Sequence, residues 1–156
     1  GLAGLELLAG IAGWSGSGIR MNTGAYGCNG NAVRDWAEIL TKDGVLKRLS
    51  CEELHFSYRH SELPADSIVV RVRLRATKDT ADAVRARIVE IRASREASQP
   101  VRARTGGSTF RNPEGHSAWA LIDDAGFRGL KLGDAQVCAQ HCNFLLNLGA
   151  SRSRHL

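Results

Sequence analysis

The chain has 156 residues, 43% of them hydrophobic, which suits one domain or two small lobes with a buried core and argues against a disordered polypeptide. The formal net charge of +5 favours an anionic partner, such as a phosphorylated small molecule or a nucleic acid. Aromatic residues make up only 6% of the chain and the basic residues are dispersed, which argues against single-strand nucleic-acid binding. The apolar start lacks a basic leader and is interrupted by Glu6, so we expect neither a signal peptide nor a membrane span.

The cysteines Cys28, Cys51, Cys138 and Cys142 do not have the spacing of a zinc ribbon. Cys138, His141 and Cys142 could share one end of a helix and hold a metal ion, but a complete site needs further ligands. We therefore expect free thiols in a reducing cytoplasm and no metal site.

In chain order, the pattern predicts a short helix over residues 2–9, ended by Gly10. A glycine-rich segment extends from there to residue 30. Such a segment presents backbone N–H groups to a phosphate or a flat ring, or it forms a mobile linker. The spacing of the glycines leaves both interpretations open because it matches no known phosphate-binding fingerprint.

Two strands at residues 36–40 and 45–49 are predicted to form a hairpin through a turn at residues 42–44. Residues 50–54 have the pattern of a capping box that starts a single helical turn. Residues 68–74 alternate between aliphatic residues and arginines, which is the clearest strand pattern in the chain.

Over residues 79–98 the apolar residues recur at helical spacing, which predicts a helix with Thr80 as its N-cap. Residues 101–104 are predicted to be an extended arm. A further helix is expected over residues 116–125, closed by Gly126. Short strands are predicted at residues 130–132 and 144–147, and a solvated basic tail at residues 151–156. This order of strands and helices predicts an α+β fold.

One stretch is a candidate for reactive chemistry, because Ser108 follows two glycines and precedes the turn-forming pair Asn112-Pro113. A serine held in such a loop can hydrogen-bond or give up a proton, although a plain turn has the same pattern.

Several segments resemble, in the same order, those of the UDP-N-acetylenolpyruvoylglucosamine reductase family. The Asn-Thr-Gly-Ala-Tyr-Gly sequence at residues 22–27 is similar to the family's Asn-Ala-Gly-Ala-Tyr-Gly segment. The resemblance continues through residues 56–61, 95–100, 106–113, 118–129, 135–137 and 141–144, and it covers the chain from Gly1 to about Gly149.

The resemblance implies the second lobe of a two-lobed FAD-binding domain at residues 1–78 and a substrate-binding domain at residues 79–156, both incomplete. It implies a cytoplasmic bacterial oxidoreductase of peptidoglycan precursor synthesis, in which FAD carries hydride from NADPH to UDP-N-acetylglucosamine enolpyruvate and UDP-N-acetylmuramate is formed.

The resemblance also implies roles for residues. Arg59 would stabilise the enolate and Ser108 would donate a proton, as the forked cation and the hydroxyl allow. The implied substrate-binding residues are Tyr58, Arg59, Asn112, His141 and Asn143. The implied cofactor-binding residues are Gly10, Gly13, Gly16, Gly18, Asn22, Gly24, Ala25 and Tyr26. Without the resemblance, Arg59 is interpreted as a member of a surface ion pair and His141 as a residue that makes a structural hydrogen bond.

The chain departs from the family pattern where Ala12 replaces a proline, Trp14 adds bulk to the flavin loop, and Asp134 replaces a glycine. The family's first flavin lobe precedes the equivalent of Gly1, and its catalytic glutamate follows the equivalent of Leu156. We therefore expect a partial or inactive reductase that self-associates or takes its missing lobe from another chain. The alternative is a non-catalytic relative that binds a UDP-sugar or another protein. A nucleic-acid partner fits the charge but not the motifs, so none is expected.

Overall fold

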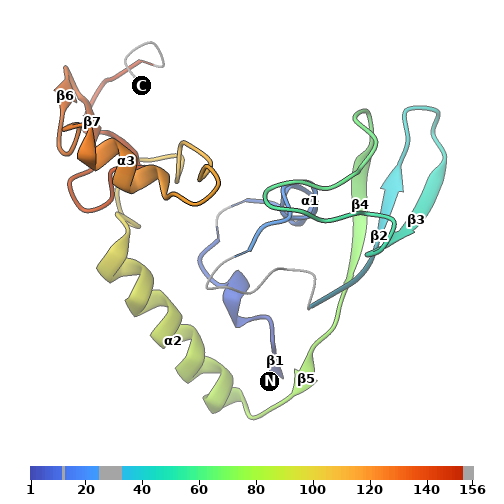
Figure 1. Ribbon diagram of the computed structural model, residues 1–156. Coiled ribbons are helices and arrows are strands. Elements are labelled where there is room, and N and C mark those ends of the chain that lie inside the picture. Colours follow the sequence, from blue (N-terminus) through green and yellow to red (C-terminus); the bar gives the residue numbers. More distant parts are fainter. Residues whose placement is uncertain (12, 25–32, 153–156) are drawn as a thin grey trace. The chain divides into compact units, whose positions relative to one another are not determined.

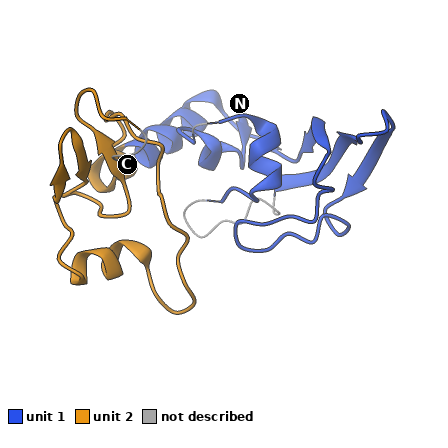
Figure 2. Cartoon of the chain, turned by 90° about the horizontal axis from the view of Figure 1, so that it is seen from above, with its two compact units in different colours: residues 1–92 blue, residues 93–156 orange. Residues whose placement is uncertain are grey.

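The computed structural model describes residues 1–11, 13–24 and 33–152, and the chain divides into two compact units, residues 1–92 and 93–156 (Figure 2). Each unit combines helices with a small antiparallel sheet, so the chain is α+β, as expected. The division falls inside helix α2 (Ala81–Ser98). The boundary predicted after residue 78 lies just before that helix and stays a prediction.

The start of the chain is not the helix predicted over residues 2–9. It forms strand β1 (Leu2–Ala3), which pairs with β5 (Thr77–Lys78), and then the 3₁₀ helix η1 (Glu6–Leu8) (Figure 1). Gly4 lies between them with a φ of +94°, a left-handed backbone angle that breaks a helix and that glycine adopts without strain. The carboxylate of Glu6 accepts a hydrogen bond from the Gly4 N–H at 2.6 Å, which closes the turn.

Glu6 is buried, with 8% of its surface exposed, and it links this turn to α2. Arg87 donates to Glu6 at 2.8 Å and to Asp79 at 2.6 Å. The N–H of Glu6 itself, the Arg87 guanidinium and the Gly4 N–H hold the pKa of Glu6 below its ordinary value of 4.5, against the opposite effect of burial. Ionised Glu6 is therefore the form that the folded state favours.

Acid should weaken unit 1 through this residue. Because the Glu6 pKa is lower in the folded state than in the unfolded state, its contribution to stability is complete above about pH 4.5 and is lost as pH falls through the folded-state pKa. Glu6→Gln should lower stability at pH 7 and flatten the acid branch of a plot of unfolding free energy against pH. Urea unfolding between pH 3 and pH 7 measures this, with the exposed Glu52→Gln as control. Equal acid sensitivity of wild type and Glu6→Gln would contradict it.

The main sheet of unit 1 has the order β3-β2-β4 and is antiparallel, from β2 (Arg34–Leu40), β3 (Leu46–Ser50) and β4 (Ile68–Leu74). The predicted hairpin is confirmed, with Leu40 opposite Leu46, and so is the predicted strand at residues 68–74. The capping box is also present as local geometry. The Glu53 N–H donates to Ser50 Oγ at 3.2 Å, and the Ser50 N–H donates to the Glu53 carboxylate at 2.8 Å.

The core of unit 1 lies on one face of this sheet, beside the short helix α1 (Ser15–Arg20) (Figure 1). Its buried residues are Ile19, Ala37, Ile39, Leu54 and Leu63. Because Ile19 belongs to this core, the glycine-rich segment is anchored on the sheet. The mobile-linker interpretation is therefore wrong for residues 13–24.

Unit 2 contains the end of α2, helix α3 (Ala118–Asp124), and a three-stranded antiparallel sheet. The sheet consists of β6 (Lys131–Leu132), β7 (Ala135–Val137) and β8 (Leu145–Asn147), in that order. Strand β7 was not predicted. The predicted extended arm at residues 101–104 is also wrong: the Val101 N–H donates to Gln99 O and the Ala103 N–H to Pro100 O, which makes tight turns.

The helices predicted over residues 79–98 and 116–125 are both confirmed, as α2 and α3. Thr80 Oγ1 accepts from the Ala83 N–H at 3.2 Å, so Thr80 caps α2. Gly126 follows α3 with a φ of +81°, as expected for the residue that ends a helix. Among the described residues, no helix has both the length and the apolar character that crossing a bilayer requires. The expected self-association stays a prediction.

Candidate functional site

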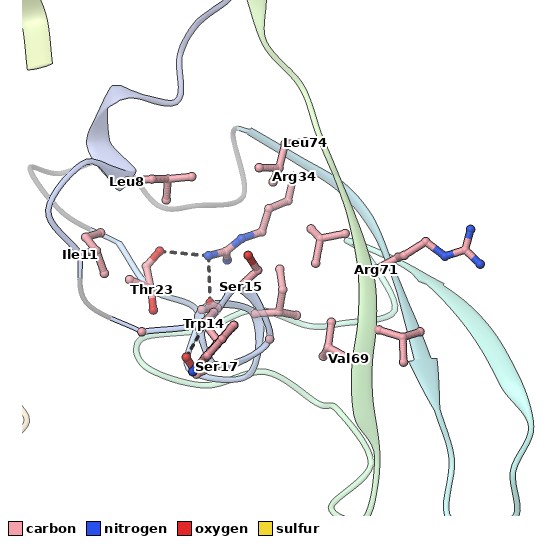
Figure 3. Close-up of a pocket in the computed structure, with 16 residues that line it drawn as sticks. Leu8, Ile11, Trp14, Ser15, Ser17, Thr23, Arg34, Val69, Arg71 and Leu74 are labelled. Atoms are coloured by element: carbon pink, nitrogen blue, oxygen red, sulfur yellow. Dashed lines mark hydrogen bonds between the residues drawn. The ribbon is translucent and has the colours of Figure 1, made fainter.

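Unit 1 contains a pocket of about 430 Å³ between the glycine-rich segment and β4 (Figure 3). One side is lined by α1 and the loop before it, and the other by residues of β4. Its lining residues are Leu8, Ile11, Gly13, Trp14, Ser15, Gly16, Ser17, Gly18, Ile19, Thr23, Arg34, Val69, Val70, Arg71, Val72 and Leu74. The pocket therefore combines backbone, three hydroxyl groups and apolar strand residues in one cavity.

Three of the predicted cofactor-binding glycines, Gly13, Gly16 and Gly18, line this pocket. Gly13 has a φ of +122°, which a residue with a side chain rarely adopts. A Cβ at Gly16 would lie 3.5 Å from the Cβ of Val69, so the backbone of α1 lies close against β4. Gly10, with a φ of +83°, lies between the lining residues Leu8 and Ile11 but is not itself among the lining residues.

Trp14 lines the same pocket, yet 88% of its surface is exposed. Its carbonyl accepts from Ser17 Oγ at 2.7 Å and from the Gly18 N–H at 3.0 Å, which starts α1. The indole therefore extends from the helix start without filling the pocket.

Arg34 is the central polar residue of this site, and it was not among the residues predicted from the sequence. Its side chain enters the pocket from the first residue of β2 (Figure 3). It donates to Gly18 O at 3.0 Å, to Thr23 O at 3.1 Å and to Asn22 Oδ1 at 2.7 Å. Burial lowers the pKa of Arg34 from its ordinary value, although a guanidinium remains charged at neutral pH. The sequence feature that could have identified Arg34 is an arginine at the start of a strand whose next inward-facing residues are apolar.

Asn22 is buried beside Arg34 with a φ of +42°, and its amide donates to Ser57 O at 2.8 Å. It therefore connects the predicted cofactor segment to the loop that holds two predicted substrate-binding residues. Arg59 Nη1 also lies 3.5 Å from Gly24 O, at the limit of a hydrogen bond. Ala25 and Tyr26, the other two predicted cofactor-binding residues, lie outside the described residues.

Tyr58 and Arg59 form the tip of a tight loop, because the N–H groups of Ser57 and His60 each donate to the carbonyl of the other residue. Arg59 has a φ of +54°, an uncommon conformation for a residue other than glycine, asparagine or aspartate. Its guanidinium lies 5.4 Å from the centre of the Tyr58 ring. Arg59 makes no ion pair with any described residue, so the surface-ion-pair interpretation lacks a partner.

In unit 2, Ser108 lies in an exposed loop that forms an isolated antiparallel bridge with Phe144. Gly107 precedes it with a φ of +95°, so glycine is needed where the chain turns into the bridge. The next residue, Thr109, donates its N–H to Asn143 O at 2.8 Å. The backbone on both sides of Ser108 is therefore fixed while the serine itself is exposed.

Asn143 holds this loop from inside the unit, with only 4% of its surface exposed. Its amide oxygen accepts from the Phe110 N–H at 2.9 Å and its amide nitrogen donates to Phe110 O at 2.8 Å. Asn112 is exposed, and its side-chain oxygen accepts from the Ala118 N–H at 3.0 Å at the start of α3. Both residues thus shape the loop, and their predicted contact with substrate stays a prediction.

His141 packs edge-on against Phe144, with 4.8 Å between ring centres, and lies 6.3 Å from the Trp119 ring. Burial lowers the pKa of His141 below its ordinary value of 6.5, so the imidazole is neutral at pH 7. Its Nδ1 has no hydrogen-bond partner among the described residues, which argues against a structural hydrogen bond at this atom.

The structure therefore brings Ser108, His141 and Asn143 together in unit 2 through Phe144 and the Ser108 loop. Arg59 and the lining glycines belong to unit 1.

Cys51, Cys138 and Cys142 are free thiols. Burial raises the pKa of Cys142, so it stays a neutral thiol. In the part of the chain that the structure describes, no three histidine, cysteine or acidic side chains gather as a metal site requires.

Comparison with known proteins gives consistent results over this chain. The C-terminal domain model of UDP-N-acetylenolpyruvoylglucosamine reductase matches residues 99–156. A reductase of that name from Gluconobacter oxydans is 68% identical over 156 residues, which are 100% of this chain and 51% of the relative. One from Acidiphilium cryptum is 59% identical over 149 residues, which are 96% of this chain and 48% of the relative.

The crystal structure of UDP-N-acetylenolpyruvylglucosamine reductase from Thermus caldophilus superposes with a TM-score of 0.89 at 37% sequence identity. The match covers 99% of this chain and 57% of that one. Fold and site thus define an α+β protein with a glycine-lined pocket in one unit and a serine loop in the other. The chain belongs to the UDP-N-acetylenolpyruvoylglucosamine reductase family and spans about half the length of the curated relatives it matches.

Proposed function

We propose that these 156 residues supply part of the active site of a bacterial cytoplasmic reductase that acts in peptidoglycan precursor synthesis. The reaction is the NADPH-linked, FAD-dependent reduction of UDP-N-acetylglucosamine enolpyruvate to UDP-N-acetylmuramate. The observation that carries the proposal is the 68% identity, over the whole chain, to a reductase named for this substrate.

The unit 1 pocket suits a part of FAD. Its volume of about 430 Å³ falls in the range of small-molecule sites, and its walls combine glycine backbone, hydroxyl groups, apolar β4 residues and one buried cation. Gly13, Gly16 and Gly18 would hold the cofactor from this wall, and Asn22 would support it through Arg34. When bound, the flavin accepts hydride from NADPH and delivers it to the substrate double bond.

Arg59 and Ser108 would act on the substrate itself. Reduction of the enolpyruvyl group leaves negative charge on the carbon beside the carboxylate, and a fixed cation lowers the energy of that enolate. The strained Arg59 conformation supports this role, because uncommon backbone angles concentrate at functional sites. Ser108 Oγ would then protonate the enolate carbon, since a strong carbon base can take a proton from a hydroxyl group. Tyr58, Asn112, His141 and Asn143 are the proposed residues around the substrate.

Binding of FAD should quench the fluorescence of Trp14, which lines the pocket and is largely exposed. Trp36 stacks on Arg48 at 4.1 Å and does not line the pocket, so its emission serves as an internal reference. Trp14→Phe should keep FAD binding, measured by equilibrium dialysis, and lose most of the quenching. A colourless protein that takes up no added FAD and shows no quenching would refute the proposed flavin site.

A further inference from the structure

Arg34 is a buried cation, and among the described residues its hydrogen-bond partners are all uncharged. Only 6% of its surface is exposed, and in the described part of the chain its hydrogen-bond acceptors are the carbonyls of Gly18 and Thr23 and the side-chain amide of Asn22. The ring of Phe56 lies 5.0 Å from its guanidinium carbon. These groups satisfy N–H donors, but none of them cancels the positive charge.

Arg71 in β4 and Arg75, which directly follows that strand, differ in this respect. Arg71 is paired with Glu38 at 2.9 Å, and Arg75 is paired with Asp35 at 2.6 Å. Among the described residues, no carboxylate lies within ion-pair distance of Arg34. Residues 12, 25–32 and 153–156, which the structure does not describe, include no aspartate or glutamate in their sequence. Among the described residues, no acidic side chain therefore compensates the charge of Arg34.

The positive charge of Arg34 lies at the wall of the pocket. Arg34 and Arg71 are both lining residues, but the Arg34 side chain extends toward Thr23, whereas the Arg71 side chain extends away from the pocket (Figure 3). The same wall carries the hydroxyl groups of Ser15, Ser17 and Thr23. A cation in an environment of low dielectric constant, with hydroxyl donors beside it, favours an anionic group over a neutral one.

We propose that Arg34 makes this pocket selective for a diphosphate, so that it retains the phosphorylated form of its ligand and discriminates against the same ring system without phosphates. This inference rests on the proposed function, which supplies a flavin as ligand. It goes further by assigning the diphosphate selectivity to one residue. Arg34 also has a structural role, because its hydrogen bonds to the carbonyls of Gly18 and Thr23 hold the segment between these residues.

The selectivity of Arg34 for a diphosphate and its structural role can be separated by comparing the binding of FAD with that of riboflavin, which shares the ring system and carries no phosphate. Arg34→Met removes the charge and keeps the length of the side chain, and Arg34→Lys keeps the charge and loses the fork. Arg34→Met should weaken FAD binding about tenfold or more while changing riboflavin binding less than about twofold. Arg34→Lys should retain most of the preference for FAD. Equilibrium dialysis of each flavin against the purified protein measures both affinities.

Arg73→Met is the control for net charge, since Arg73 is 65% exposed, pairs with Asp35 and does not line the pocket. It should leave both affinities unchanged. Equal loss of FAD and riboflavin binding in Arg34→Met would show that Arg34 only holds the loop, and unchanged FAD binding would show no role; either result overturns the inference. Failure of the wild type to bind either flavin refutes the flavin site as well.

Salt provides a second measurement if both Arg34 variants unfold. In the wild type, added sodium chloride should weaken FAD binding more than riboflavin binding, because only FAD carries a charge for the cation to attract. Identical salt dependence of the two flavins would contradict the inference.

Discussion

Ser108→Ala is expected to reduce the rate of enolpyruvyl reduction about 10²- to 10⁴-fold, the usual contribution of a positioned general acid. The assay is substrate-dependent oxidation of NADPH by the protein that carries these 156 residues. Because the serine supplies the proton in the transition state, kcat should fall far more than KM changes. Ser108→Cys, which restores a proton donor, should recover part of the rate.

The structure makes this substitution a clean test. Ser108 is exposed, and no hydrogen bond between described residues uses its Oγ, so the alanine variant keeps the contacts that shape the loop. Thr109→Ala is the matched control, because it removes a neighbouring exposed hydroxyl and leaves the backbone bond to Asn143 intact. It should retain nearly full activity. A Ser108→Ala variant with wild-type kcat would exclude Ser108 as the proton donor.

Asn143→Ala should be the most destabilising of these changes, lowering the free energy of unfolding by about 2–3 kcal/mol, the combined value of two buried hydrogen bonds. Its side chain makes both bonds to the backbone of Phe110, as a paired strand would. Activity should fall as well, because Ser108 lies two residues before Phe110. Urea unfolding followed by Trp119 fluorescence reports on the stability of unit 2.

Asn143→Asp sharpens the result, because it keeps the acceptor for the Phe110 N–H and loses the donor to the Phe110 carbonyl. It also places a charge in a site that is 4% exposed, so it should be destabilised at pH 7 and partly recover in acid. The exposed Arg111→Ala, in the same loop, should change stability by less than about 0.5 kcal/mol. If Asn143→Ala unfolds at the same urea concentration as wild type, the loop does not depend on Asn143.

Sequence reasoning succeeded where the signal is local. The alternation of residues 68–74 gave β4, and Thr80 and Gly126 marked where helices begin and end. Side-chain period and caps depend on residues within a few positions of one another, so one segment contains the whole signal. It failed at residues 2–9, where apolar residues suggested a helix but Gly4 and the pairing of β1 with β5 produced an extended start.

The residues of the candidate site likewise include some that the sequence predicted and one that it did not. The resemblance identified Gly13, Gly16 and Gly18, and these residues do line one pocket. It did not identify Arg34, since an arginine at the start of a strand is exposed in most proteins. Its burial depends on contacts with Gly18 and Thr23, which lie 16 and 11 positions away.

By itself, the sequence determined the α+β class, the principal strands and helices, the family and the glycine-rich segment, because each of these is encoded by neighbouring residues or by motif order. Only the tertiary structure decided that this segment is anchored on a sheet, that Glu6 is buried against Arg87 from 81 positions away, and that Asn143 supports the Ser108 loop. The physical reason is that burial and charge compensation depend on which distant segments pack together, and no local pattern specifies those partners.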